Sequence, residues 1–389
     1  MKRILLAIVL ILPALGFGVD FSGFVDSTFS YVERNDNSVL TNIFASYPNY
    51  SFYSTLKLSA KSDNFSVVGR AFVDYVSLTN SFYFDEFYLN FSVFDLVSFK
   101  VGRQVLGFGV GYLWNPANSF DLPKDLFSMD KYRIGVDAIK VNFDFSKFTD
   151  VPFNISTFLL PPVWEANSKI DLSYSKVGAY SYVFINPFEF GFTAGYQRLT
   201  NDREDVAFGV FCSVDVLGSI VGVEASASRK NQVFFINQSG EITNYSDFFM
   251  QSLVTFNRRI SEKSFLVFEY YYNNFGFSNE EVERLFDTLK TNVFVLSKFY
   301  DRFTPGNLSK NNVFVGVSWE VIENLGVSLS ALCNLDRLGV LLYPVVSYSI
   351  SDNFDVSFEV SLNFASDKRS EISEAIYKNF YSLRFVGYF

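Results

Sequence analysis

The stretch Phe354–Phe364 alternates strictly between apolar residues at even positions and polar or charged residues at odd positions. Successive side chains of a β-strand point to opposite faces, so a period of two gives a strand with one apolar and one polar face. The pattern recurs at residues 313–321, where Phe314 is the exception, and at residues 139–146. In a transmembrane β-barrel the apolar faces of the strands point outward and the polar faces line the interior, so this pattern is typical of such a barrel.

Alternation, together with turn residues between the segments, predicts eighteen strands. They lie at residues 19–33, 50–61, 65–77, 82–93, 97–109, 135–146, 152–160, 171–185, 188–198, 205–216, 219–229, 247–259, 265–275, 312–322, 325–335, 339–350, 354–365 and 378–389. The long connections all follow odd-numbered strands, which is expected when both termini lie in the periplasm and the long loops face outward. We therefore expect an all-β, antiparallel up-and-down barrel of 18 strands, with 16 possible if a pair near residues 152–160 is misassigned.

The chain ends on an aromatic residue, Phe389, at the end of an alternating strand. Tyr381, Leu383 and Phe385 form one apolar edge of that strand with Phe389. This ending resembles the C-terminal signature of bacterial outer-membrane β-barrels, and the resemblance implies that Phe389 is an assembly signal. It also implies two partners, the barrel-assembly machinery and the lipid of the outer membrane.

The N-terminus predicts a signal peptide at residues 1–18, with the barrel at 19–389. Lys2 and Arg3 precede an apolar run at residues 4–12, and Pro13 ends the run. About nine apolar residues fall well short of the roughly 20 that a membrane-spanning helix needs. We expect this signal peptide to direct export through the inner membrane and to be cleaved after Gly18, and we expect the mature chain to lie in the bacterial outer membrane.

Composition excludes several classes of function. The sequence has no histidine, which excludes Ser-His-Asp and Cys-His nucleophiles and histidine-ligated zinc, so we expect no enzyme, metal or cofactor. The formal net charge is −9, which argues against nucleic acid as a partner. Cys212 and Cys333 both fall on apolar strand edges and are expected to be unpaired small hydrophobes.

Residues 101–121 resemble a segment of poorly characterised bacterial outer-membrane barrels of porin type. The matching positions are Gly102, Arg103, Gln104, Gly107, Gly109, Asn115 and Pro116. The resemblance implies a barrel and a pore, without naming a solute. In general porins the third outer loop, here residues 110–134, folds into the lumen and narrows it. The alternative is that the glycines only permit a bend at the rim, with the loop charges solvated outside.

Charged and polar residues of this loop and of the inward strand faces are candidates for the pore lining or constriction. They are Arg70, Lys100, Gln104, Asp121, Lys124, Asp125, Lys140, Asp144, Glu320, Glu359 and Arg384. Opposed acids and bases would set a field across the constriction. Alternatively, these charges are solvated wall residues paired between neighbouring strands. The predicted inward faces also carry Lys57, Asp74, Glu86, Glu224, Glu269 and Asp355, and over all inward charges the slight excess of acids leans toward cation selectivity.

Residues 278–303 predict one amphipathic helix in an outer loop, because Ser278 and Glu281 form a capping box and apolar residues follow at helical spacing. Its apolar stripe must be buried. Three placements remain open from the sequence: packing at the barrel rim, insertion into the lumen as a plug or gate, and docking on a neighbouring subunit.

These features predict an outer-membrane porin that gives small hydrophilic solutes or ions passive passage through a water-filled lumen. One alternative is a substrate-specific or polymer-export channel, and another is a structural surface barrel with a blocked lumen. General porins of this size are commonly trimers, so the resemblance implies a homotrimer.

Overall fold

The computed structural model describes residues 19–43, 49–62, 65–76, 79–93, 96–122, 133–146, 148–162, 175–200, 203–237, 241–292, 295, 299, 308–364, 370, 372, 374, 375 and 377–389. The predicted signal peptide and the candidates Lys124 and Asp125 lie outside these residues. No helix within them is long and apolar enough to span a membrane.

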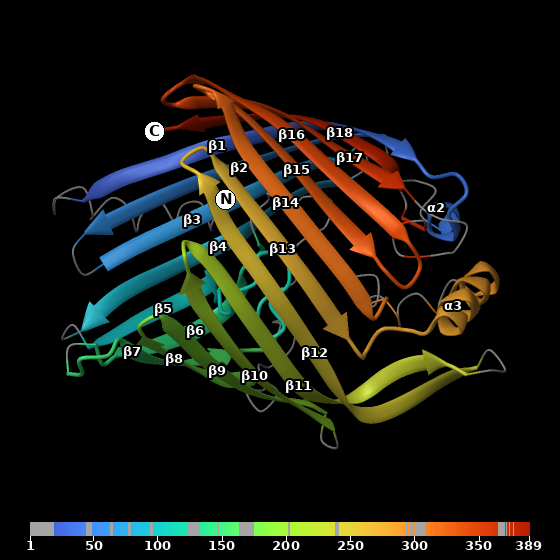
Figure 1. Cartoon of the computed structure of the whole chain (residues 1–389), viewed down its shortest axis with the longest axis horizontal. Helices are drawn as coiled ribbons and strands as arrows, with labels where there is room; N and C mark the ends of the chain where they lie inside the picture. Colours follow the sequence, from blue (N-terminus) through green and yellow to red (C-terminus); the bar gives the residue numbers. More distant parts are fainter. Residues whose placement is uncertain are drawn as a thin grey trace.

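Eighteen antiparallel strands form one closed sheet in the described residues, so the prediction of 18 rather than 16 strands is confirmed (Figure 1). The strands are β1 (Asp20–Arg34), β2 (Tyr50–Ser62), β3 (Phe65–Val76), β4 (Thr79–Val93), β5 (Val97–Gln104), β6 (Val136–Asp144), β7 (Phe153–Leu160), β8 (Lys176–Ile185), β9 (Phe188–Thr200), β10 (Arg203–Val216), β11 (Ser219–Ile236), β12 (Ile242–Ser261), β13 (Ser264–Asn273), β14 (Asn311–Ile322), β15 (Leu325–Asn334), β16 (Gly339–Ser351), β17 (Phe354–Phe364) and β18 (Tyr377–Tyr388). Each strand pairs with the next, and β18 pairs with β1.

The apolar faces of the strands lie outside the barrel, as the alternation predicts. Outward side chains such as Phe358 and Leu383 are 49% and 41% exposed, whereas the inward neighbours Glu359 and Ser382 are 1% and 2% exposed. Such an inside-out distribution suits a wall that faces lipid hydrocarbon. Cys212 and Cys333 are free and half-buried, as expected.

The seam between β1 and β18 is closed by backbone and side-chain contacts. The backbone amide groups of Gly23 and Phe389 exchange hydrogen bonds of 2.8 and 3.0 Å. Farther along the same two strands, Arg384 on β18 donates to both carboxylate oxygens of Asp26 on β1, at 3.0 and 2.8 Å. It also lies 3.5 Å from Glu359 on β17, which accepts a 2.7 Å bond from Tyr343. We call Asp26, Arg384 and Glu359 the seam triad.

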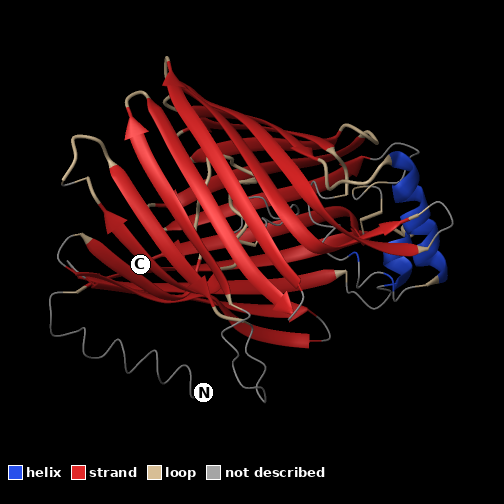
Figure 2. Cartoon of the chain, turned by 90° about the horizontal axis from the view of Figure 1, so that it is seen from below, coloured by secondary structure: helices blue, strands red, loops and turns tan. Residues whose placement is uncertain are grey.

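The two ends of the barrel differ. Connections after even-numbered strands are mostly short, and we call this the turn end. The other end carries the long connections and both helices, and we call it the loop end (Figure 2). The sequence predicts one helix, but the described residues contain two: α3 (Asn279–Thr291) and a short α2 (Val39–Ile43) in the first outer connection. Five residues are too few to show a helical period, which explains the omission.

Helix α3 has the predicted capping box, because Ser278 accepts from the Glu281 amide group and Glu281 accepts from the Ser278 amide group. It ends at Thr291, earlier than predicted. Its apolar stripe is buried at the loop end, against α2 and the far ends of β11 and β12, which agrees with the first of the three placements. We call this cluster the outer cap: Val39, Leu40, Ile236, Phe277, Val282, Leu285, Phe286, Leu289, Val295, Phe299 and Leu308.

Candidate functional site

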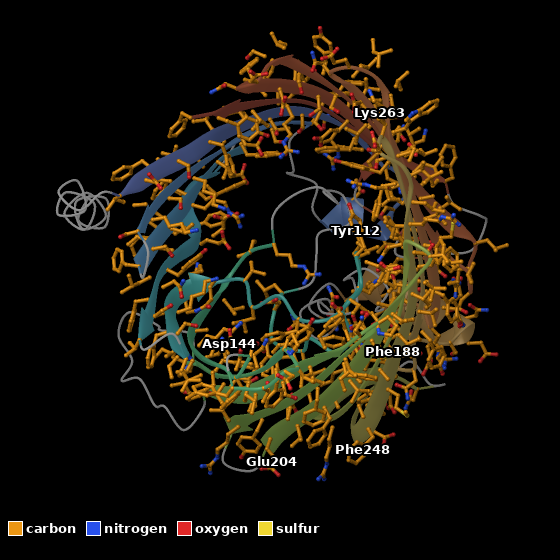
Figure 3. The ribbon with its side chains drawn as sticks, turned by 60° about the vertical axis from the view of Figure 1, so that its left-hand side comes forward. Tyr112, Asp144, Phe188, Glu204, Phe248 and Lys263 are labelled. Carbon is orange, nitrogen blue, oxygen red and sulfur yellow. The ribbon has the colours of Figure 1, made fainter. Side chains whose placement is uncertain are left out.

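The described part of the connection between β5 and β6, residues 105–122 and 133–135, folds into the barrel, and we call it loop 3. Figure 3 shows Tyr112 of this loop inside the ring of strands. β5 ends at Gln104, five residues before the predicted end, and the chain then bends at Gly107 and Gly109, whose φ values of +65° and +95° are ones that glycine adopts readily. The glycines therefore permit a bend, and the bend directs the loop inward.

The first part of loop 3 packs on the inner wall formed by β6, β7 and β8. The ring of Phe108 stacks on Tyr180 with centroids 4.4 Å apart, and on Phe158 at 5.3 Å. Phe120, on the returning part of the loop, meets Phe158 edge-on at 4.4 Å. Leu106 completes this buried cluster. Apolar side chains thus hold one end of the loop to the wall.

The tip of loop 3 packs on the inner wall formed by β12 to β16. Trp114 stacks on Tyr271 at 5.0 Å, and Tyr112 stacks on Phe314 at 5.6 Å. Phe314 is the residue that breaks the alternation of β14, and this contact explains the exception. Leu113 and Trp114 share a buried cluster with the wall and with Ile372 of the last outer connection.

Two buried glutamates of the wall bind the backbone of the loop tip. Glu224 on β11, 3% exposed, accepts from the amide groups of Val110, Gly111 at 2.9 Å and Ala117 at 3.1 Å. Glu269 on β13 has no exposed surface. It accepts from the amide groups of Tyr112, Leu113 at 2.9 Å and Trp114 at 3.3 Å.

Two carboxylates therefore accept hydrogen bonds from six backbone amide groups, and bonds to charged acceptors are the strong ones. We call Glu224 and Glu269 the loop clamps. The sequence marks both residues only as inward charges, and nothing in it indicates that their partners are backbone groups more than 100 positions away.

The returning part of loop 3 is fixed by further polar contacts. Asp121 accepts from the amide groups of Leu106 and Gly107 and from the Asn118 side chain, each at 2.8 Å. Arg70 on β3 donates to the Arg133 carbonyl at 2.8 Å. Burial lowers the pKa of the Arg133 guanidinium, while Asp121 and the loop clamps act in the opposite direction.

The described candidates from the sequence fall into three groups. Near loop 3 lie Asp121, Arg70, Lys100 and Lys140; Arg70 is 3% exposed and donates to Asp85 at 2.8 Å. In the wall, Glu359 and Arg384 belong to the seam triad, and the fully buried Gln104 donates to the carbonyls of Lys100, Gly102 and Ala138. At the turn end lie Asp144, which accepts from the Ser146 amide group, and Glu320, which pairs with Lys263 at 3.1 Å.

A cavity of about 380 Å³ with a mixed polar and apolar lining separates loop 3 from the wall formed by β8 to β13. Amide and hydroxyl side chains contribute to its lining, among them Asn115, Asn118, Gln197, Gln251 and Ser226. Loop 3 therefore does not fill the whole space between its two apolar contact areas. Among the described residues, no group of three or more Cys, Asp or Glu side chains is placed to hold a metal ion.

The substitution Gly109→Ala is expected to loosen loop 3, and Gly107→Ala is its matched control. An added Cβ at Gly109 would lie 2.6 Å from the Glu224 carboxylate, and its φ of +95° adds a strain of about 1–3 kcal/mol. At Gly107 a Cβ would meet no atom within 4 Å, and φ is +65°. Single-channel recordings should show extra current noise for Gly109→Ala only; equal noise in both variants contradicts this account of the bend.

Solved structures that resemble this chain include two outer-membrane proteins, and the similarity to the first of them, OccK8, supports the barrel fold. Pseudomonas aeruginosa OccK8 (OprE) is similar with a TM-score of 0.54 and 9% identity, covering 96% of this chain and 98% of OccK8. Salmonella typhi OmpF, solved with daunomycin, is similar with a TM-score of 0.47 and 9% identity, covering 95% of this chain and 97% of OmpF. No protein-family model matches the sequence, and no curated protein is significantly similar to it. At 9% identity, the similarity to OccK8 shows the fold alone.

Proposed function

We propose that this protein is an outer-membrane channel through which small hydrophilic solutes diffuse passively. The observation that carries the proposal is the inward-folded loop 3, held in a barrel with a polar inner face by the two loop clamps. A structural barrel has no need of a loop held in this way, whereas a pore uses such a loop to set its width. The apolar outer wall and the structural likeness to OccK8 support the membrane location.

The test is the single-channel conductance of the full chain, purified from membranes, in a planar lipid bilayer. Discrete steps that persist without any added partner are expected. Heat-modifiable migration on gels shows whether the protein is folded. If folded protein shows no step conductance, the lumen is blocked and the structural-barrel alternative is favoured.

A narrow, solute-selective channel is a second candidate, because a residue of a second connection packs on the cluster that holds loop 3. Ile372, from the connection between β17 and β18, is 2% exposed and shares the buried cluster of Leu113 and Trp114. In liposome swelling, a general porin admits neutral sugars at rates set by size alone. A selective channel admits one chemical class faster than others of equal size.

We also propose that the barrels associate, with the homotrimer as the expected state. Arg103 and Asp137 form an ion pair on the outer face of β5 and β6, with N to O at 2.7 Å and exposures of 36% and 57%. Charged groups on a lipid-facing wall are costly unless protein or headgroups cover them. Native mass spectrometry of the detergent-extracted protein should detect a trimer; a monomer alone contradicts the proposal.

A further inference from the structure

Three lysines project from one side of the inner wall: Lys57 on β2, Lys100 on β5 and Lys140 on β6. We call them the lysine arc. Lys100 stands directly opposite Lys140 in the pairing of β5 and β6, and Lys57 stands opposite Arg70 in the pairing of β2 and β3. Like charges opposite one another on paired strands destabilise a sheet. An arrangement that costs folding free energy is most often found at a functional site.

Each ammonium group of the lysine arc lies against an aromatic ring. The Nζ atom of Lys100 lies 3.8 Å from the centroid of Tyr88, that of Lys140 lies 5.2 Å from Phe108, and that of Lys57 lies 5.9 Å from Phe24. A cation–π contact positions an ammonium group without cancelling its charge. Phe108 belongs to loop 3, so the arc lies at the level where the loop narrows the lumen.

The three lysines keep part of their surface. Among the described residues, none of the three forms an ion pair with a carboxylate. All three side chains are half-buried, so each presents some surface to a solute. The lysine arc therefore offers three accessible positive charges.

Six carboxylates of the inner wall, by contrast, are buried and engaged. Arg70 pairs with Asp85 and Glu86, Arg384 pairs with Asp26 and Glu359, and the loop clamps accept backbone amide groups. None of these six residues is more than 9% exposed. Asp121 is half-buried, but both of its oxygens accept bonds from loop 3 itself.

We propose that the lysine arc makes this channel select anions, and that its solutes are small organic oxyanions carrying a carboxylate or phosphate group. The inference rests on the proposed channel function. It runs against the cation leaning drawn from the slight acid excess on the inward strand faces, because a solute in the constriction interacts with the groups it touches. Charges farther than about 8 Å away are largely screened at physiological ionic strength.

The reversal potential of single channels under a KCl gradient tests the proposal. Wild type should favour chloride, and the triple variant Lys57→Gln, Lys100→Gln, Lys140→Gln should shift the permeability ratio toward potassium. One unit charge at ~6 Å in water changes a local ion concentration about threefold, so each lysine should contribute about that factor. Lys290→Gln on the exposed side of α3 is the matched control and should leave the ratio unchanged.

Each outcome bears on a different claim. A wild-type channel that favours potassium, or a triple variant with an unchanged ratio, overturns the lysine arc as the selectivity element. If the triple variant does not fold, the three single variants must each shift the ratio in the same direction, and no shift overturns the proposal. Absence of any conductance in folded wild type instead overturns the proposed function, and the inference with it.

The oxyanion class is tested by competition for the chloride current. Added acetate or succinate, and separately inorganic phosphate, should lower the chloride current of wild type and leave the triple variant unaffected. Block by carboxylates only, or by phosphate only, identifies which oxyanion the channel takes. Block by neither contradicts the oxyanion class even if the channel favours chloride.

Discussion

Substituting glutamine for both loop clamps, Glu224 and Glu269, is expected to release the tip of loop 3 from the barrel wall. Each carboxylate accepts three amide groups with two oxygens. A glutamine of the same size keeps one acceptor oxygen and points an NH2 donor at amide groups that also donate. A hydrogen bond to a charged group contributes about 1.5–3 kcal/mol, so the double variant loses several kcal/mol of loop attachment.

A loss of 1.4 kcal/mol already changes an equilibrium about tenfold, so detached states of the loop should be readily visible. Single-channel recordings of the double variant should show a higher mean conductance and frequent transitions between levels. Glu189→Gln is the matched control, because within the described part of the chain Glu189 accepts from the hydroxyls of Tyr182 and Ser213, which can rotate to accept from an amide. If the recordings of the double variant are the same as those of wild type, apolar packing alone holds the loop.

Replacing Arg384 by methionine is expected to destabilise the closed barrel strongly. Arg384 is the cation of the seam triad, and its partners Asp26 and Glu359 are 3% and 1% exposed. Removing one member of a buried ion pair leaves an uncompensated charge and costs about 3–5 kcal/mol. The midpoint of denaturant unfolding in detergent measures the loss.

Two further variants separate the seam from general effects of lost charge. Lys263→Met breaks an ion pair with Glu320 whose side chains are 51% and 42% exposed, and exposed pairs contribute only about 0–1 kcal/mol. Adding Asp26→Asn to Arg384→Met should recover part of the loss, because it removes one of the two stranded charges. If Arg384→Met unfolds no more readily than Lys263→Met, the seam triad does not stabilise closure.

The sequence predicts the strands well because lipid and lumen impose the same period of two on each of them. The errors lie where another constraint replaces that period. β5 stops early at the positive φ values of Gly107 and Gly109, which alternation does not reveal. β11 continues past residue 229 to Ile236, and β12 begins at Ile242, before residue 247. These two extensions pair as a hairpin in a stretch that the sequence predicts to be an outer loop, and their register shifts after Lys230.

The site is less predictable, because its contacts join residues far apart in the chain. The loop clamps and the seam triad look in the sequence like any other inward charge. One usable signal is present: apolar residues on the polar face of a strand mark the places where a loop packs. Phe314 is such a residue, and Leu253, Leu332 and Leu341 are others, all buried in the cluster beneath loop 3.

The outer cap joins three separate stretches of the exposed loop end into one surface. α3 has 13 residues, and helices this short are marginal in isolation, so its shape depends on packing against α2 and the hairpin of β11 and β12. Arg337, in the connection after β15, pairs with Glu283 and donates to the Asn279 carbonyl, which fixes the start of α3 to the rim. An antibody that recognises this region would therefore bind a conformational epitope, and a synthetic peptide of residues 279–291 would be a poor immunogen for the native protein.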